Sequence, residues 1–407
     1  MAIYSMDNTI QGYDWGSPTT LPLFLGKENP SGEPWAELWM GAHPKAPSMV
    51  TDPLSGEKKA LNRLIAEDPM MILGAPTAKQ FGGTLPFLFK ILCAAKPLSI
   101  QAHPFKQKAA HGFSREESAG IPLDAPERNY KDANHKPETV IALSRFEGMC
   151  GFRRIDQIVG NIKALYPNGW EHIAGRMASE PDRVELSVFF YTFLTLESEA
   201  KAKRLRYARS KCERIVSDEP LGSELRAACL WVLRLMETYP DDIGALAPLV
   251  FNLFTLEPGQ ALNLAPGEPH AYLEGMAAEI MANSDNVLRG GLTSKHVDIQ
   301  EFVSTLSFDC LDLDIMKPEP LENRFTAYRV NVPDYAIAKA IVSGRLTQPD
   351  RAQAPEILLC IDGTVEIVNK TGTRVTLSRG TSVFLSADEP GYELSGSGTV
   401  FKAGVPT

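Results

Sequence analysis

The sequence predicts a mainly β protein that is built from two β-barrels and an α-helical insertion. Three observations support this fold class. The 407 residues include 30 prolines and 31 glycines, a turn-rich composition that favours short strands over a helical bundle. Amphipathic helical patterns are confined to one internal block. A twenty-residue segment occurs twice in the strand-rich part of the chain.

Strand patterns fill the first 150 residues and return after the helical block. Residues 85–92 and 139–143 are short apolar runs, which are typical of buried strands. Strand texture resumes at Phe254 and continues toward the C-terminus. The helices therefore lie between two strand-rich regions of the chain and do not follow them.

Helical patterns occupy the interval between these strand-rich regions. Apolar residues recur at three- and four-residue spacing, with i,i+4 charge pairs, over residues 155–165, 184–196, 200–216 and 224–239. We therefore expect residues 1–152 and 246–315 to form a first barrel, residues 153–245 a helical domain, and residues 316–407 a second barrel.

The internal repeat indicates that the two barrels are copies of one unit. Residues 256–275 align without a gap on residues 377–396, with seven identities. Two hairpins that are alike by chance remain the alternative. His270 is aligned with Gly391, and all seven histidines lie at or before His296. The second barrel therefore cannot carry an imidazole metal site, and we expect the chemistry in the first.

Charge and cysteine use restrict the class of partner and the compartment. A net charge of −9 disfavours nonspecific binding to nucleic acid or to an anionic membrane. No stretch approaches the roughly 18 apolar residues that span a bilayer, and the N-terminus has no signal-peptide pattern. The six cysteines are scattered without a CxxC pair, which is typical of reduced, buried thiols. We expect a cytoplasmic protein.

Four polar residues next to predicted strands have the chemistry of a metal site. Gln101 and His103 are two residues apart and so share one face of a strand. Glu138 precedes another strand, and His270 ends a Pro-Gly-Glu-Pro-His turn. Two imidazoles and a carboxylate suit Zn²⁺ or another borderline divalent metal, with the amide oxygen of Gln101 as a harder fourth ligand.

The other histidines give weaker signals. His135 lies three residues before Glu138 and is the exception among them. The rest have no partner at ligand spacing or lie in a polar turn, and we predict no role for them: His43, His111, His172 and His296.

Six segments between residue 12 and about residue 296 carry a specific resemblance. They are Gly12-Tyr-Asp-Trp-Gly-Ser17 and residues 35–44, 85–90, 98–104, 130–138 and 279–293. Through them the sequence resembles the type I phosphomannose isomerases. Pro97 and the pair Phe105-Lys106 depart from the family pattern without touching a ligand position.

The resemblance implies a fold, a cofactor and an activity. The implied fold has two jelly-roll-like barrels of cupin type and a helical domain. The implied site holds one Zn²⁺ per chain through Gln101, His103, Glu138 and His270, beside a catalytic Arg289. The implied activity interconverts mannose 6-phosphate and fructose 6-phosphate, by moving a proton between C1 and C2 through a cis-enediolate. We expect a monomer that feeds mannose 6-phosphate toward activated mannose or mannose into glycolysis.

Roles for individual residues follow from this chemistry as hypotheses. Arg289 carries a permanently charged guanidinium group, which can donate hydrogen bonds to the enediolate oxygens or to the phosphate. Lys136 is our first choice of general base, because nearby positive charge favours the neutral form of a lysine. Glu279 is the competing carboxylate, and His135 could assist ring opening. The substrate and its phosphate are expected to contact Lys90, Ser99, Lys295, Asp14 and Trp15.

Three other functions remain as alternatives. Barrels with two histidines and a carboxylate also hold Fe(II) in oxygenases, although Gln101 would fill a position that O₂ requires. A non-catalytic sugar-binding barrel would not need Lys136, Glu279 and Arg289. A bifunctional isomerase–nucleotidyltransferase is disfavoured, because the sequence has no glycine-rich nucleotide loop.

Overall fold

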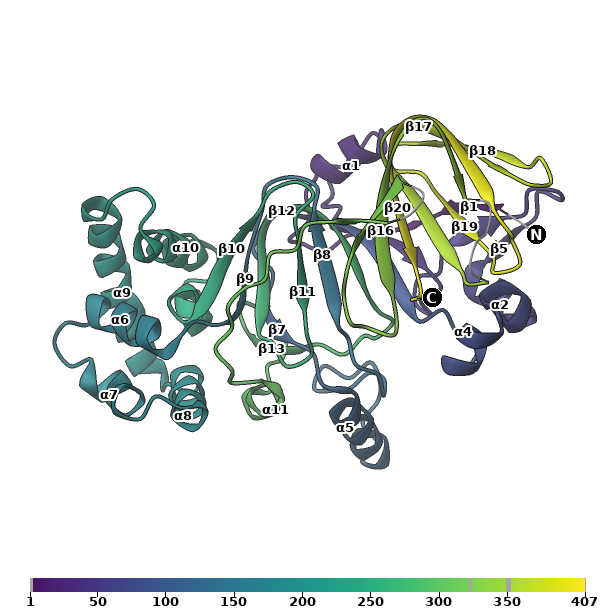
Figure 1. Cartoon of the computed structure of the whole chain (residues 1–407). Helices are drawn as coiled ribbons and strands as arrows, with labels where there is room; N and C mark the ends of the chain where they lie inside the picture. Colours follow the sequence, from purple (N-terminus) through teal and green to yellow (C-terminus); the bar gives the residue numbers. More distant parts are fainter. Residues whose placement is uncertain (1–2, 322–323, 349–352, 407) are drawn as a thin grey trace.

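The protein consists of a helical block, a central sheet and a C-terminal sheet (Figure 1). The computed structural model describes residues 3–321, 324–348 and 353–406. The predicted ranges 1–152 and 316–407 thus include residues 1–2, 322–323, 349–352 and 407, which lie outside the described residues. A mainly β fold with a helical block is confirmed.

The central sheet has ten strands and carries all the predicted metal ligands on or beside its strands. Its main path runs through β10 (Phe251–Leu256), β9 (Phe146–Phe152), β12 (His270–Ala282), β6 (Phe87–Ala94), β3 (Glu37–Gly41) and β2 (Thr9–Gln11). The strands off this path are β7 (Ile100–Ala102), β8 (Glu138–Ala142), β11 (Ala261–Leu264) and β13 (Leu288–Gly291).

The C-terminal sheet also has ten strands, and it recruits three of them from the N-terminal part of the chain. Its path runs through β14 (Glu319–Pro320), β15 (Phe325–Tyr328), β16 (Ala336–Gln348), β20 (Tyr392–Gly404), β17 (Glu356–Asn369), β19 (Ser382–Leu385), β1 (Ile3–Asp7), β4 (Met49–Thr51) and β5 (Lys58–Ala60), with β18 (Arg374–Ser378) on β17. The predicted domain limits stay a prediction, but the pairing places β1, β4 and β5 with the C-terminal strands.

The two segments of the internal repeat share an unusual backbone position. Gly275 has φ +122°, and a Cβ there would lie 2.5 Å from the carbonyl oxygen of Arg145. Its counterpart in the repeat, Gly396, has φ +120°, and a Cβ there would lie 2.5 Å from the carbonyl oxygen of Thr364. Only glycine fits both requirements, which explains the identity of this repeat position.

Four of the five helices in the helical block lie where the periodicity predicts them. They are α6 (Ile155–Leu165), α8 (Arg183–Leu194), α9 (Ser198–Asp218) and α10 (Glu224–Thr238), while α7 (Glu171–Ser179) was not predicted. Side chains of Asp182 and Ser223 accept hydrogen bonds from the first backbone amides of α8 and α10 and so fix where these helices begin.

The remaining helices are short, apart from α5, and surround the sheets (Figure 1). They are α1 (Thr20–Leu25), α2 (Leu61–Glu67), α3 (Pro69–Leu73), α4 (Ala75–Gln80), α5 (Lys106–Ser118), the 3₁₀ helix η1 (Ile243–Leu249) and α11 (Ile299–Thr305). Among the described residues, no helix has the length and apolar character needed to cross a membrane.

Two apolar cores join the three parts of the molecule. One packs Met149 and Phe152 of β9 against Leu186 and Val232 of the helical block. The other packs Phe87 of the central sheet against Phe384 and Phe401 of the C-terminal sheet. No disulfide joins the six cysteines, which all lie within the described residues, and five of them are buried, which confirms the prediction that the cysteines are mostly buried.

Candidate metal centre and active-site cavity

Three of the four predicted ligands meet at one buried point of the central sheet. His103 directly follows β7, while Glu138 and His270 are the first residues of β8 and β12. One ligand atom of each lies within 4.8 Å of the others, and all three residues are almost completely buried. The Nε2 atoms of His103 and His270 lie 3.2 and 3.4 Å from the Glu138 carboxylate.

The hydrogen bonds of the two imidazoles define their tautomers. Nδ1 of His103 lies 2.6 Å from the carbonyl oxygen of Asn286, and Nδ1 of His270 lies 2.9 Å from that of Glu268. Because a carbonyl oxygen only accepts, each Nδ1 carries the proton and each Nε2 presents a lone pair. Both Nε2 atoms are buried and have no hydrogen-bond partner among the residues that the structure describes, which fits a metal ion as their common partner.

Electrostatics keep His103 and Glu138 in the protonation states that a metal requires. Burial lowers the pKa of His103 to about 4, so the ring is neutral at pH 7. Burial raises the pKa of Glu138, but the nearby His103 and Lys136 lower it by more. The pKa of this carboxyl therefore lies well below its ordinary value. Gln101 is paired in the sheet register with both His270 and Arg289, which places its side chain on their face of the sheet.

The cluster lies against a cavity of about 1010 Å³. Ten of the thirteen predicted site residues line it: Asp14, Trp15, Lys90, Ser99, Gln101, Lys136, Glu138, Glu279, Arg289 and Lys295. His103 and His270 lie beneath this lining, at 1% and 0% exposure. The structure therefore brings most of the predicted site together from strands far apart in sequence.

A buried network of charges forms one wall of the cavity. Lys90 Nζ lies 3.0 Å from Glu279 Oε2 and 3.7 Å from Glu37 Oε1. Burial lowers the pKa of Lys90, but these two carboxylates raise it above its ordinary value. Tyr272 donates to Glu279 Oε1 at 2.9 Å, and Trp39 donates to Glu37 Oε2 at 2.6 Å. The charge of Lys90 is thus already balanced, which fits poorly with its predicted contact to a phosphate.

Arg289 and Lys295 form a cationic part of the cavity wall. Among the described residues, none accepts a hydrogen bond from the Arg289 guanidinium, although this residue is partly buried. Burial lowers the pKa of both side chains, and Arg289 lowers that of Lys295 further. Two cations that lie close enough to influence one another attract an anion into the cavity.

His135 is the predicted site residue that the structure does not bring to the cavity. Its Nε2 lies 2.8 Å from Oδ2 of Asp334, a buried carboxylate in the segment between β15 and β16. Successive side chains of an extended segment point to opposite faces, and Lys136 is the neighbour that faces the cavity. The proposed help of His135 in ring opening therefore has no support from this geometry.

Several residues of the site carry no assignment from sequence reasoning. Glu37, Trp39 and Tyr272 belong to the buried network, and His43 and Asp285 line another part of the cavity. His43 Nε2 lies 3.4 Å from Asp285 Oδ1. Glu37 and Trp39 are two residues apart on β3, a spacing that could have indicated a shared face.

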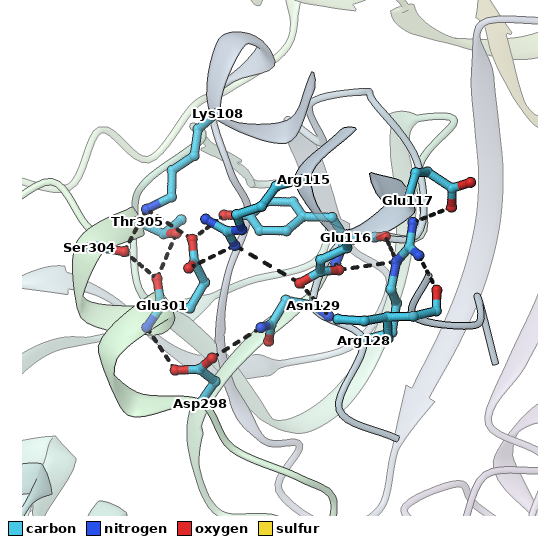
Figure 2. A network of polar contacts seen from close by, with 12 residues as sticks. Lys108, Arg115, Glu116, Glu117, Arg128, Asn129, Asp298, Glu301, Ser304 and Thr305 are labelled. Carbon is cyan, nitrogen blue, oxygen red and sulfur yellow. Dashed lines mark hydrogen bonds and ion pairs between the residues drawn. The ribbon is translucent and has the colours of Figure 1, made fainter. Parts of the chain in front are cut away.

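Figure 2 shows a second network of polar contacts, and two of its residues also line the cavity. Arg128 Nε lies 3.0 Å from Glu116 Oε2, and the same carboxylate accepts the backbone amide of Tyr130 at 2.9 Å. The Tyr130 hydroxyl donates to Glu301 Oε1 of α11 at 2.6 Å. Arg128 and Asn129 line the cavity. The network thus connects α5, the segment before Lys136, and α11.

Comparisons with known proteins agree over nearly the whole chain. Residues 3–155 match the family model of the phosphomannose isomerase type I catalytic domain, and residues 325–403 match the mannose-6-phosphate isomerase cupin domain. The mannose-6-phosphate isomerase of Escherichia coli K12 is 40% identical over 393 residues, which cover 96% of each chain. The human mannose-6-phosphate isomerase is 34% identical and covers 95% of this chain and 94% of its own.

A solved structure extends this similarity to three dimensions. Mannose 6-phosphate isomerase from Salmonella typhimurium, bound to fructose 6-phosphate and zinc, aligns with a TM-score of 0.90 and 36% identity over 100% of both chains. The fold and the buried His–Glu–His cluster define a sheet-rich protein with a cupin domain and a site for one metal ion. The chain belongs to the type I phosphomannose isomerase family.

Proposed function

We propose that the chain is a zinc-dependent isomerase that interconverts D-mannose 6-phosphate and D-fructose 6-phosphate. The observation that carries this proposal is the buried cluster of His103, Glu138 and His270, which lies beside a cavity lined by Arg289. Within the part of the chain that the structure describes, the two Nε2 atoms of this cluster have no hydrogen-bond partner. The zinc and fructose 6-phosphate in the structure of the Salmonella relative support the same assignment.

His103, Glu138 and His270 would hold the zinc ion, with Gln101 as the fourth ligand. When bound, zinc supplies a Lewis acid for the sugar oxygens. The neutral His103 and the ionised Glu138 are ready to bind a cation without first losing a proton.

Arg289 and Lys295 are our candidates for the anionic parts of the substrate. The guanidinium can donate two parallel hydrogen bonds to a phosphate or to the oxygens of an enediolate. Lys295 lies on the segment that follows Arg289, and its Nζ is 5.9 Å from the centroid of the Tyr13 ring. Ser99, Asp14 and Trp15, which also line the cavity, would position the sugar.

Lys136 is our candidate for the group that moves the proton. It would take the proton from C2 of the open-chain aldose and deliver a proton to C1 of the cis-enediolate, while the hydroxyl proton on the C2 oxygen passes to the C1 oxygen, which gives the ketose. Lys136 Nζ lies 3.2 Å from Glu138 Oε1, beside the ligand cluster. Both oxygens of the competing Glu279 are engaged, by Lys90 and by Tyr272, which leaves that carboxylate less free to act.

Each sheet would form one barrel of cupin type, and β1, β4 and β5 would complete the C-terminal barrel. The matched backbone geometry of Gly275 and Gly396 supports two copies of one unit. A monomeric state and a cytoplasmic location stay predictions from the sequence.

The test is conversion of mannose 6-phosphate to fructose 6-phosphate by the purified protein, before chelation, after chelation, and after zinc is restored. We expect activity that chelation removes and zinc restores, with solvent deuterium incorporated into the sugar. A zinc-loaded protein that binds the sugar phosphate without deuterium exchange would instead be the non-catalytic sugar-binding alternative. The base assignment is wrong if Lys136→Ala keeps near-normal turnover while Glu279→Gln abolishes it.

A further inference from the structure

The segment that carries Lys136 and Glu138 has two functionally different faces. Lys136 and Glu138 point to the metal cluster and the cavity. His135 and Thr139 point to the opposite side, where Asp334 and Tyr335 of the C-terminal part of the chain contact them. This alternation is the two-residue period of an extended chain that runs into β8.

Both contacts on the far side are specific polar interactions in a buried setting. The Asp334 carboxylate lies 2.8 Å from His135 Nε2, and Asp334 is 3% exposed. The Tyr335 hydroxyl lies 3.0 Å from Thr139 Oγ1, and both residues are completely buried. Burying such groups costs free energy unless they find partners, so each contact favours one position of the segment.

The direction of the second hydrogen bond follows from the Thr139 hydroxyl. This hydroxyl has one proton, which it donates to Asn263 Oδ1 on β11 at 3.1 Å. It therefore accepts from Tyr335, whose own proton is directed at Thr139. Thr139 therefore has hydrogen bonds both to Asn263 of the central sheet and to Tyr335 in the segment before β16, directly beside Glu138.

We propose that Asp334 and Tyr335 are positioning residues, which hold His135 and Thr139 so that Lys136 and Glu138 stay aimed at the metal cluster. The proposal rests on the function proposed above. The C-terminal part of the chain contains no histidine. The proposal gives this part a role in the reaction in addition to its own folding. A displacement of about 1 Å at a reacting group can cost up to a hundredfold in rate.

The test uses full-length, zinc-loaded protein and compares Tyr335→Phe with Tyr328→Phe. Each variant loses one hydroxyl, and each hydroxyl joins the C-terminal part to the central sheet. Tyr328 donates to the carbonyl oxygen of Gly259 at 2.8 Å, away from the cluster. Asp334→Ala is compared with Asp334→Asn, which keeps an oxygen that can accept from His135.

We expect Tyr335→Phe and Asp334→Ala to lower kcat about tenfold at saturating zinc and to weaken zinc binding about tenfold, with little change in KM. Tyr328→Phe should change neither quantity, and Asp334→Asn should recover most of the loss. In a His135→Ala background, Asp334→Ala should have little further effect, because Asp334 acts through His135.

The two readouts separate failure of this proposal from failure of the proposed function. If the unmodified protein isomerises mannose 6-phosphate, and Tyr335→Phe and Asp334→Ala keep its kcat and zinc affinity, the positioning role is wrong and the function stands. If the unmodified protein is inactive but these two variants still weaken zinc binding, the function is wrong and the positioning of Glu138 stands. Equal losses in Tyr328→Phe would overturn the positioning role, because they would indicate a general loss of packing.

Discussion

At the scale of single residues, Asn286 connects two loops that carry the metal cluster. Its carbonyl oxygen lies 2.6 Å from Nδ1 of His103. Its side chain accepts from the amide of Lys131 at 2.7 Å and donates to the carbonyl oxygens of Asp132 and Asn134 at 2.8 Å each. Asn286 is completely buried, so this one residue links His103, through its backbone carbonyl, to the segment that leads to Glu138, through its side chain.

We therefore expect Asn286→Ala to weaken zinc binding by about tenfold, because the backbone carbonyl that orients His103 stays but loses the side-chain hydrogen bonds that hold it in place. The zinc affinity of each variant is measured by competition between the protein and a chromophoric chelator. Asn369→Ala is the matched control, because Asn369 is also a buried asparagine that accepts backbone amides in a turn, far along the chain from the cluster. An equal loss of zinc affinity in both variants would contradict the specific role of Asn286.

Asp285, the neighbour of Asn286, gives a prediction about pH. Burial raises the pKa of its carboxyl, but hydrogen bonds from His43 and Lys45 hold the pKa well below the ordinary 3.8. As the pH falls below about 4, the unfolded chain binds this proton first, so the stability that ionised Asp285 contributes at neutral pH is lost.

Urea unfolding at several pH values tests this linkage. Asp285→Asn should cost about 1 kcal/mol at pH 7, since Lys45 is 66% exposed and solvent weakens its contact. The difference from the unmodified protein should shrink between pH 4 and pH 3. A difference that stays constant with pH would mean that the charge of Asp285 does not contribute.

The residues of the His–Glu–His cluster could be picked out from the sequence because their chemistry is visible in residue type and spacing. His103 and Gln101 share a strand face, and His270 stands where the second copy of the repeat has Gly391. The direction of His135 could not be predicted, because it depends on a buried carboxylate 199 positions away. The ion pair between Lys90 and Glu279 could not be predicted either, because these residues are 189 positions apart in the sequence.

At the scale of elements, α5 and the segment before Lys136 are joined by the buried pair Glu116–Arg128 (Figure 2). The Arg128 side chain is fully buried, and that of Glu116 is 5% exposed. Glu117 contacts the same guanidinium at 2.6 Å, but its side chain is 51% exposed. The two adjacent glutamates thus form a matched comparison of a buried and an exposed ion pair.

We expect Glu116→Ala to lower the free energy of unfolding by about 3 kcal/mol, because it removes the buried counter-charge of Arg128 and leaves the buried amide of Tyr130 without its acceptor. Glu117→Ala should cost about 0–1 kcal/mol. Denaturant unfolding of the two variants measures the difference. Similar costs for both would show that burial does not decide the strength of this network.

Helices and strands were predicted best where a regular pattern of apolar residues extends over many positions. The pattern over residues 155–165 coincides with α6, and the run over residues 85–92 falls largely within β6. The pattern could not show which sheet a short strand joins. Ile3 pairs with Leu385, and Met6 pairs with Ser382, so the membership of β1 is decided by packing between the ends of the chain.

At the scale of the whole molecule, the two sheets share one apolar core. Phe87 and Ile280 of the central sheet lie in the same buried cluster as Ile357, Phe384 and Phe401 of the C-terminal sheet. Each large side chain buried in this way contributes about 1.5–3 kcal/mol. Because the net stability of a protein is only about 5–15 kcal/mol, the loss of a few such contacts is enough to unfold the central part.

We therefore expect a chain that ends at residue 315 to lose cooperative folding, although it keeps every predicted ligand and catalytic residue. Its strands β1, β4 and β5 would also lack the strand β19 on which they assemble. Circular dichroism and thermal unfolding measure the loss, and zinc binding should disappear with it. Coexpression of residues 316–407 should restore both properties, because the shared core can then form. A truncated chain that unfolds cooperatively and binds zinc as tightly as the full chain would show instead that the central part is an independent domain, as the predicted limits imply.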